Sequence, residues 1–216
     1  MTETTSTRAD TAPRGVRMPR DERRAQLLAA ATDVFVNNGY HATVMDDIAE
    51  HAGVSKPVLY QHFPGKLELY LALLQRHADE LVSRVQAAIE ETHDNWQRVL
   101  NAVGTYFDFV DGDDEAFRLV FESDLRNQPP VQAIVEQMYT ACVRPIAQAV
   151  VADAGLDPDR AWLVAIGVVG ISEHGARYWL TRRHELPKEE AVALTASLAW
   201  KGLAGFPLQH PDPIHG

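Results

Sequence analysis

The amino-acid sequence predicts an all-α protein, with a small helix-turn-helix domain near the N-terminus and a larger helical domain after it. Three observations favour this fold class. Apolar residues recur at three- and four-residue intervals over most of the 216 residues. Residues 43–66 contain two short helical patterns joined by a tight turn. No segment has the alternation of polar and apolar residues that is typical of a strand, and no internal repeat is present.

Residues 43–66 hold the local signals of a helix-turn-helix. Thr43 is expected to cap the first helix through its hydroxyl, and Asp46 places an acid in the first turn, where the helix dipole favours it. Gly53 can adopt the left-handed conformation that ends a helix, and Ser55 can cap the second helix. This order of helix, short turn and helix is typical of a DNA-binding motif.

The outward face of the second helix carries side chains suited to DNA. Hydroxyl, imidazole and ammonium groups can donate to phosphate oxygens, as can the free N–H groups of the first helix. Gln61 can pair with an adenine edge, Val58 can contact a thymine methyl, and Lys56 can reach a guanine. The predicted DNA-binding residues are Thr43, Lys56, Pro57, Val58, Tyr60, Gln61, His62 and Lys66. The alternative is an ordinary three-helix core with a polar surface.

This stretch resembles the N-terminal signature of the TetR family of one-component transcription regulators. The matching residues are Thr43, Ile48, Ala49, Ala52, Gly53, Val54, Ser55, Leu59, Tyr60, Phe63 and Lys66. The resemblance implies a three-helix DNA-binding domain, a C-terminal domain for effector binding and dimerisation, and a homodimer on double-stranded operator DNA. One departure is Gly65, where the family usually has a serine that caps the next helix, so a looser entry into that helix is expected.

Charge is distributed unevenly along the chain, whose formal net charge is −10. Residues 1–66 hold eight basic and eight acidic side chains, so the excess of acid lies in the remainder. Six arginines cluster at the start: Arg8, Arg14, Arg17, Arg20, Arg23 and Arg24. Residues 1–18 are polar and non-periodic, and we expect a flexible basic arm in which Arg14 and Arg17 either enter a minor groove or stay solvated.

The sequence pattern and the resemblance together divide the chain into four parts. They are a flexible basic arm at 1–18, a helix-turn-helix DNA-binding domain at 19–66, a helical effector-binding and dimerisation domain at 67–207, and a tail at 208–216. Outside the helix-turn-helix, helices are expected over residues 20–38, 67–91, 96–110, 130–153, 158–183 and 187–206. The helix over 67–91 should link the two domains, and Pro145 should kink or loosen the helix that contains it.

The last two expected helices are rich in small residues, which favours close contact between helices. They include Ala161, Ala165, Gly167, Gly170, Gly175, Ala176, Ala191, Ala193, Ala196 and Ala199. In the resemblance, this pair of helices forms the four-helix bundle of a homodimer. Packing within a single chain is the alternative.

Catalytic and metal chemistry find little support. Ser172, Glu173 and His174 are adjacent, but successive helical residues point about 100° apart and cannot form a relay between a nucleophile and a base. The nine histidines show no metal-ligand spacing, and no phosphate-binding glycine loop is present. We therefore expect no enzyme activity, no cofactor and no metal. An all-helical enzyme that uses acyl-CoA is a remote alternative that lacks a visible acid and base.

An effector pocket in TetR-like proteins lies between the linking helix and the helices after it. By resemblance, the expected lining is Leu81, Ile89, Tyr106, Phe107, Phe121, Met138, Cys142, Val169 and Ser172. Charged side chains are scarce among these candidates, which favours a long apolar effector over a small ionic one. Ordinary core packing of the same aromatic and sulfur side chains is the alternative.

A narrower resemblance extends from residue 20 to about residue 180, to TetR-family regulators of fatty-acid synthesis in actinobacteria. The segments that carry it are RDERRAQLL, DVFV, GVSKPVLYQHF, KLELYLALL, FRLVFESD, GLDP and ARYWL. This likeness implies an activator of fatty-acid synthase genes that long-chain acyl-CoA releases from DNA. The cations available for its phosphates are Arg98, Arg118, Arg126, Arg144 and Arg177. A TetR-type repressor of an efflux or catabolic operon, with another hydrophobic effector, is the alternative.

Composition bears on the cellular compartment. The single cysteine, Cys142, cannot form an intramolecular disulfide, which fits a reducing cytoplasm. The longest apolar run, residues 161–171, is too short to span a bilayer, and the N-terminus lacks the apolar segment of a signal peptide. We expect a cytoplasmic protein with no membrane partner.

Overall fold

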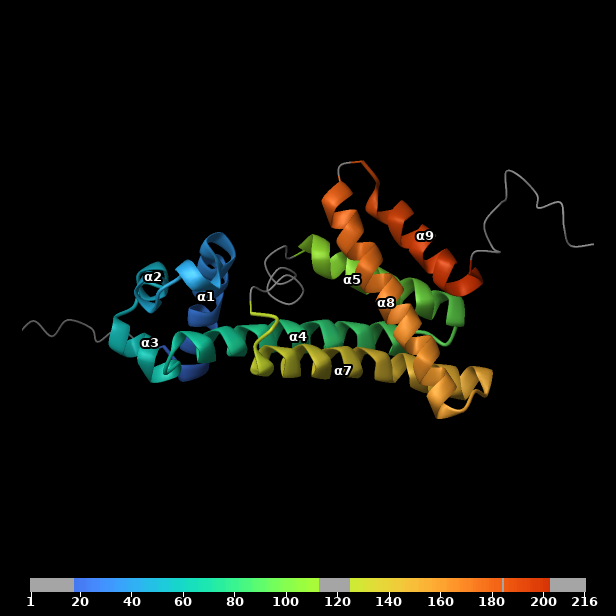
Figure 1. Cartoon of the computed structure of the whole chain (residues 1–216), viewed down its shortest axis with the longest axis horizontal. Coiled ribbons are helices and arrows are strands. Elements are labelled where there is room, and N and C mark those ends of the chain that lie inside the picture. Colours follow the sequence, from blue (N-terminus) through green and yellow to red (C-terminus); the bar gives the residue numbers. More distant parts are fainter. Residues whose placement is uncertain (1–17, 113–124, 184, 203–216) are drawn as a thin grey trace, which may run out of the picture.

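The computed structural model describes residues 18–112, 125–183 and 185–202, and the regular structure in these ranges is helical throughout (Figure 1). The helices are α1 (Arg20–Ala42), α2 (Met45–His51), α3 (Lys56–His62), α4 (Lys66–Glu90), α5 (Asn95–Gly112), α7 (Pro129–Ala154), α8 (Pro158–Arg182) and α9 (Lys188–Lys201). The predicted all-α fold class is confirmed. Residues 1–17 of the expected arm, and the expected tail at 208–216, lie outside the described residues.

The first helix, α1, buries Leu27, Ala31 and Phe35. It packs on α2 and α4. We call residues 18–66 the DNA-binding half, after the sequence prediction. The sequence predicts a helix end at Gly39, and this residue interrupts the helix with φ 75° and ψ 162°, a conformation that side chains with a Cβ rarely adopt. After Gly39, one short turn completes α1. In this turn Tyr40 folds back as predicted, and its ring stacks on that of Phe35 with 5.9 Å between the ring centroids.

The start of α2 differs from the prediction. Its N-cap residue is Val44 rather than Thr43. The Thr43 hydroxyl donates instead to the Gly39 carbonyl at 2.8 Å, and the residue is fully buried. Thr43 therefore closes the end of α1, because the carbonyls left free by the break at Gly39 need donors. The turn from α2 to α3 is as predicted, with Gly53 at φ 64°. Ser55 occupies the N-cap position of α3, but its side chain makes no capping hydrogen bond.

Helix α4 leads from the DNA-binding half into the other described residues, 67–112, 125–183 and 185–202, which we call the effector half after the sequence prediction (Figure 1). Its 25 residues span about 37 Å at 1.5 Å per residue. Near its start the buried side chains are Leu69, Tyr70 and Leu73, whereas the predicted Leu67 and Leu71 are only half-buried. The difference arises because α1 also packs on this part of α4, so that a second face is covered.

In the effector half, α4 and α7 lie side by side, and α5 and α8 pack across them (Figure 1). Helix α9 then packs on α5 and α8. The Asp157 carboxylate caps α8 by accepting from the Arg160 N–H at 3.1 Å. Helix α7 continues through Pro145 as one helix. Apolar side chains of both halves form one continuous core along α4. None of the described helices is both long and apolar enough to cross a bilayer.

Candidate DNA-binding face and effector cavity

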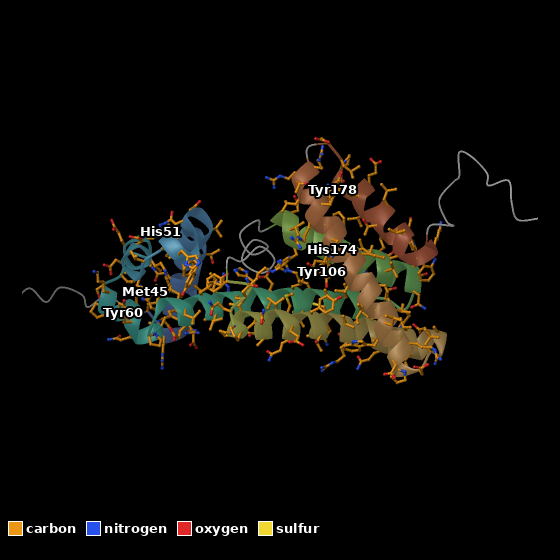
Figure 2. The ribbon with its side chains drawn as sticks, in the orientation of Figure 1. Met45, His51, Tyr60, Tyr106, His174 and Tyr178 are labelled. Carbon is orange, nitrogen blue, oxygen red and sulfur yellow. The ribbon has the colours of Figure 1, made fainter. Side chains whose placement is uncertain are left out.

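Helix α3 turns Leu59 fully into the core and leaves the predicted reading positions accessible. Those that are exposed or half-buried are Lys56, Pro57, Val58, Tyr60, Gln61 and His62. Tyr60 is 48% exposed and lies near one end of the molecule, on the DNA-binding half (Figure 2). Lys56 forms an ion pair with Asp46 of α2, in which both side chains are more than half exposed. Since exposed ion pairs contribute little, a phosphate could compete for this ammonium.

The start of α1 lies beside α3, which the sequence alone did not reveal. A hollow between them is lined by Met18, Pro19, Arg20, Arg23, Val58, Gln61 and His62. The Arg24 guanidinium stands 4.4 Å from the centre of the Phe63 ring and donates to the His62 carbonyl at 3.4 Å. Burial, followed by the charges of these arginines, lowers the pKa of His62 below its usual range. The face that carries α3 therefore combines a neutral imidazole with arginines that belong to α1.

Two predicted DNA-binding residues have other partners in this structure. Thr43 is buried with its hydroxyl bonded to α1. The Lys66 ammonium donates to the carbonyls of Tyr40 and Thr43, both at 2.8 Å. Both residues therefore join elements within the protein. The signal for this role is absent from the local sequence, because the partners of Lys66 lie 23 and 26 positions away.

A mainly apolar cavity of about 220 Å³ lies in the effector half, at the end of α4 far from α3. Its lining residues are Ile89, Asn95, Arg98, Val99, Ala102, Ile146, Ala149, Val150, Asp153, Ala154, Val168 and Trp200. We call this space the distal cavity. Its main cation is Arg98, which donates to Asp153 at 2.5 Å and to the Thr92 carbonyl at 2.8 Å. The guanidinium is thus held at the cavity by protein acceptors.

The predicted effector residues occupy three kinds of position. Ile89 lines the distal cavity, and Met138 borders a second, more polar hollow of about 470 Å³. The packed core holds Leu81, Tyr106, Phe107, Cys142, Val169 and Ser172, each at most 3% exposed. Phe121 lies outside the described residues. The distal cavity was missed because its lining comes from the ends of helices that are far apart in the sequence.

Tyr106 and Cys142 form a buried polar pair in that core. Burial and the neighbouring Cys142 raise the pKa of Tyr106 well above its usual range. Burial raises the pKa of the Cys142 thiol to about 11. Both groups are therefore neutral near pH 7. Glu173 lies on the adjoining helix, with Arg177 at 3.7 Å, and its charge contributes to both shifts.

Ser172 and His174 do not act together. The Ser172 hydroxyl donates to the Val168 carbonyl at 2.7 Å and is fully buried. The ring of His174 is bonded to the Gly170 carbonyl at 2.9 Å and is exposed on another face of α8 (Figure 2). The two side chains thus have separate backbone partners, as the helical spacing predicted.

The small residues of α8 and α9 face in two directions. A Cβ at Gly175 would approach Thr195 of α9 to 3.2 Å, so this glycine allows the two helices to pack within the chain. A Cβ at Gly167 or Gly170 would meet nothing within 4 Å. Large apolar side chains are also exposed on these helices: Leu163, Val164, Ile166, Tyr178, Leu194 and Trp200. Such a face is typical of a protein–protein contact.

Comparisons with known proteins agree with this geometry. The family model described as "Bacterial regulatory proteins, tetR family" matches residues 27–73, and "Tetracyclin repressor-like, C-terminal domain" matches residues 96–202. The chain is 52% identical over 195 residues to the HTH-type transcriptional activator FasR of Mycolicibacterium smegmatis, covering 90% of this chain and 89% of that protein. A tetR-family regulator from Streptomyces coelicolor is 30% identical, with a TM-score of 0.66, over 90% of this chain and 94% of its own. FadR from Bacillus subtilis, solved with stearoyl-CoA, shares the fold at 19% identity, with a TM-score of 0.69, over 83% of this chain and 98% of its own.

Proposed function

Because the chain belongs to the TetR family of bacterial transcription regulators, we propose that it binds operator DNA as a cytoplasmic homodimer and that long-chain acyl-CoA releases it. The observation that carries the proposal is the 52% identity to FasR, which extends through the effector half as well as the helix-turn-helix. The narrower resemblance to regulators of fatty-acid synthesis and the stearoyl-CoA bound by FadR of Bacillus subtilis support the ligand class. Since FasR is named an activator, we propose activation of fatty-acid synthesis genes.

DNA recognition is assigned to α3 and the start of α1. Gln61 and Val58 would read base edges in the major groove, while Tyr60 and His62 would donate to phosphates. Arg20 extends this phosphate-binding surface, because it lies beside Val58, Gln61 and His62 in the same hollow. In a dimer, two α3 helices about 34 Å apart would enter successive major grooves. The exposed apolar side chains of α8 and α9 supply the contact between protomers.

Effector binding requires the effector half to open. The distal cavity, about 220 Å³, is smaller than the roughly 300–1,000 Å³ typical of ligand sites. A long acyl chain would therefore displace packed side chains such as Tyr106 and Cys142, which lie deeper along α5 and α7. Opening between α4 and α7 would tilt α4 and change the separation of the two α3 helices. To convert mostly bound protein into mostly free protein, ligand must prefer the open state by several kcal/mol, on the order of 3 to 5.

The test is fluorescence anisotropy of a labelled DNA fragment from the protein's own promoter region. We expect specific binding that palmitoyl-CoA abolishes and that free CoA leaves intact. Binding that palmitoyl-CoA does not change would contradict the ligand, and absence of specific binding would contradict the regulator. Size-exclusion chromatography with light scattering of the same sample should give the mass of a dimer.

The small volume of the distal cavity favours a second candidate. A compact hydrophobic effector would fit about 220 Å³ with less opening than an acyl chain needs. The function would then be that of a TetR-type repressor of an efflux or catabolic operon. Release of DNA by a compact apolar compound, with no response to palmitoyl-CoA, would favour this candidate.

A further inference from the structure

The second hollow of the effector half, of about 470 Å³, is bordered by α7 and by one residue of α8, Glu173. Its other lining residues are Arg126, Val131, Gln132, Val135, Glu136, Met138 and Tyr139. Val131, Val135 and Met138 are three to four positions apart, so they share one face of α7. The next turn of that face carries the buried Cys142. The hollow therefore leads from the surface toward the core around Cys142.

The charged side chains that line this hollow differ in their exposure. Arg126 and Glu136 are exposed, whereas the Glu173 side chain is only 12% exposed. Water and salt screen exposed charges, but they screen a mostly buried charge much less. Glu173 therefore has the strongest effect on a charged group that enters the hollow.

Glu173 has a cationic neighbour on its own helix. The Arg177 guanidinium lies 3.7 Å from the Glu173 carboxylate, and its side chain is 32% exposed. This distance is longer than a hydrogen bond, so the two groups attract each other without close contact. The positive charge of Arg177 is thus balanced by Glu173. Without that carboxylate, a half-buried cation would stand beside the hollow.

The charge of Glu173 also acts on the interior beyond the hollow. Burial raises the pKa values of Tyr106, Tyr139 and Cys142 above their usual ranges, and the negative charge of Glu173 adds to each shift. Each of these groups would become an anion on losing its proton. The same charge would therefore oppose the entry of any other anion into this part of the core.

We infer that Glu173 is a specificity residue, which keeps Arg177 paired and so excludes free fatty acids while it admits acyl thioesters. This inference rests on the proposed function for the class of ligand. A fatty acid carries its carboxylate directly at the head of the chain, where burial beside another carboxylate is costly. A thioester is neutral, and the phosphates of CoA lie at the far end of the pantetheine arm, where they can stay in water. Selectivity then comes from an unfavourable contact with the wrong ligand.

The experiment measures release of the labelled promoter fragment by palmitoyl-CoA and by palmitate. We expect the wild-type protein to respond to palmitoyl-CoA and to need a concentration of palmitate higher by about tenfold or more. Glu173→Gln keeps the size of the side chain and should remove this difference, with its response to palmitoyl-CoA retained. Asp159→Asn removes an exposed acid from the same helix and is the matched control. A wild-type protein that responds equally to both compounds, or a Glu173→Gln variant that still rejects palmitate, would overturn the inference.

The double variant Glu173→Gln/Arg177→Gln tests the part that Arg177 plays. If the cation beside the hollow accepts the carboxylate once Glu173 is replaced, the double variant should respond to palmitate several times more weakly than Glu173→Gln alone. Equal responses of the single and double variants would show that Arg177 is not the group that Glu173 occupies.

Calorimetry separates this inference from the proposed function. Decanoate and methyl decanoate have the same acyl chain, with and without the charge, and their binding is measured without DNA. If palmitoyl-CoA fails to release the wild-type protein, the proposed ligand is wrong, but the wild-type protein should still bind the ester and reject the acid, and Glu173→Gln should bind both. Equal binding of the two compounds by the wild-type protein, or binding of neither by both proteins, would overturn the role of Glu173 by itself.

Discussion

The DNA-binding half and the effector half place their functional groups in opposite ways. In the first, short helices around Leu59 keep the core inside and expose polar side chains such as Tyr60 and Gln61. In the effector half, long helices enclose the side chains predicted to contact an effector, so that Tyr106 and Cys142 are almost fully buried. A DNA contact can therefore be removed singly, whereas a site for the proposed long acyl chain would require a rearrangement of the core. Substitutions in the two halves should differ in kind: loss of affinity in one, loss of stability or response in the other.

The largest expected effect tests whether the two halves share one core. Phe107 is 1% exposed, and its ring lies 5.7 Å from that of Trp179. Phe107→Ala should lower the free energy of unfolding by about 3–5 kcal/mol, since it leaves a cavity among α5, α8 and α9. Because the core continues along α4, urea denaturation should show one transition for both halves. A separate transition for the DNA-binding half would show that the two halves unfold independently and do not share one core.

The next effect concerns the response to ligand. Ala149 of α7 lines the distal cavity and is half-buried, so Ala149→Leu should fill part of that space. We expect the concentration of palmitoyl-CoA that half-releases DNA to rise about tenfold, equivalent to ~1.4 kcal/mol, with DNA affinity unchanged. Ala133→Leu, at an exposed position on the same helix, is the matched control. Equal responses from the two variants would place the ligand elsewhere.

A smaller effect is expected on the DNA-binding face. Tyr60→Phe removes one exposed hydroxyl and should weaken DNA binding by roughly 0.5–1.5 kcal/mol, because one hydrogen bond to phosphate is lost. Binding to altered operators should weaken by the same factor, since phosphate carries no sequence information. Ser83→Ala, which removes an exposed hydroxyl from α4 outside the proposed DNA face, is the control and should leave DNA affinity unchanged. A loss confined to one base pair would instead place Tyr60 on a base edge.

The smallest expected effect tests how far the DNA face extends onto α1. Arg20→Gln should lower the log–log salt slope by about 0.9 and weaken all sequences alike. Arg160→Gln removes the same charge from an exposed position at the start of α8, far from α3 along the chain. Equal slopes for Arg20→Gln and the wild-type protein would confine the DNA face to α2 and α3.

The sequence predicted the DNA-binding half well because its signals are local. Gly53 and Gly39 require conformations that few other residues adopt, so the turn and the helix end could be located directly. The roles of Thr43 and Lys66 could not be predicted in this way. A threonine hydroxyl can cap a helix and a lysine ammonium can bind a phosphate, but the same groups can equally well form the internal hydrogen bonds that the structure shows. The distal cavity was still harder to predict, because residues that meet there, such as Arg98 and Asp153, are 55 positions apart in the sequence. Periodicity shows which face of a helix is buried but not what it meets.

The buried Cys142 gives the protein a chemical reporter of its own. It is the single cysteine of the chain, it is 1% exposed, and its pKa of about 11 keeps the sulfur in the unreactive thiol form at neutral pH. A thiol reagent can therefore modify the protein only while the interior between α5 and α7 is exposed to water. The rate of alkylation, followed by mass spectrometry, would measure how often the interior opens, and therefore how much of the opening precedes the arrival of any ligand.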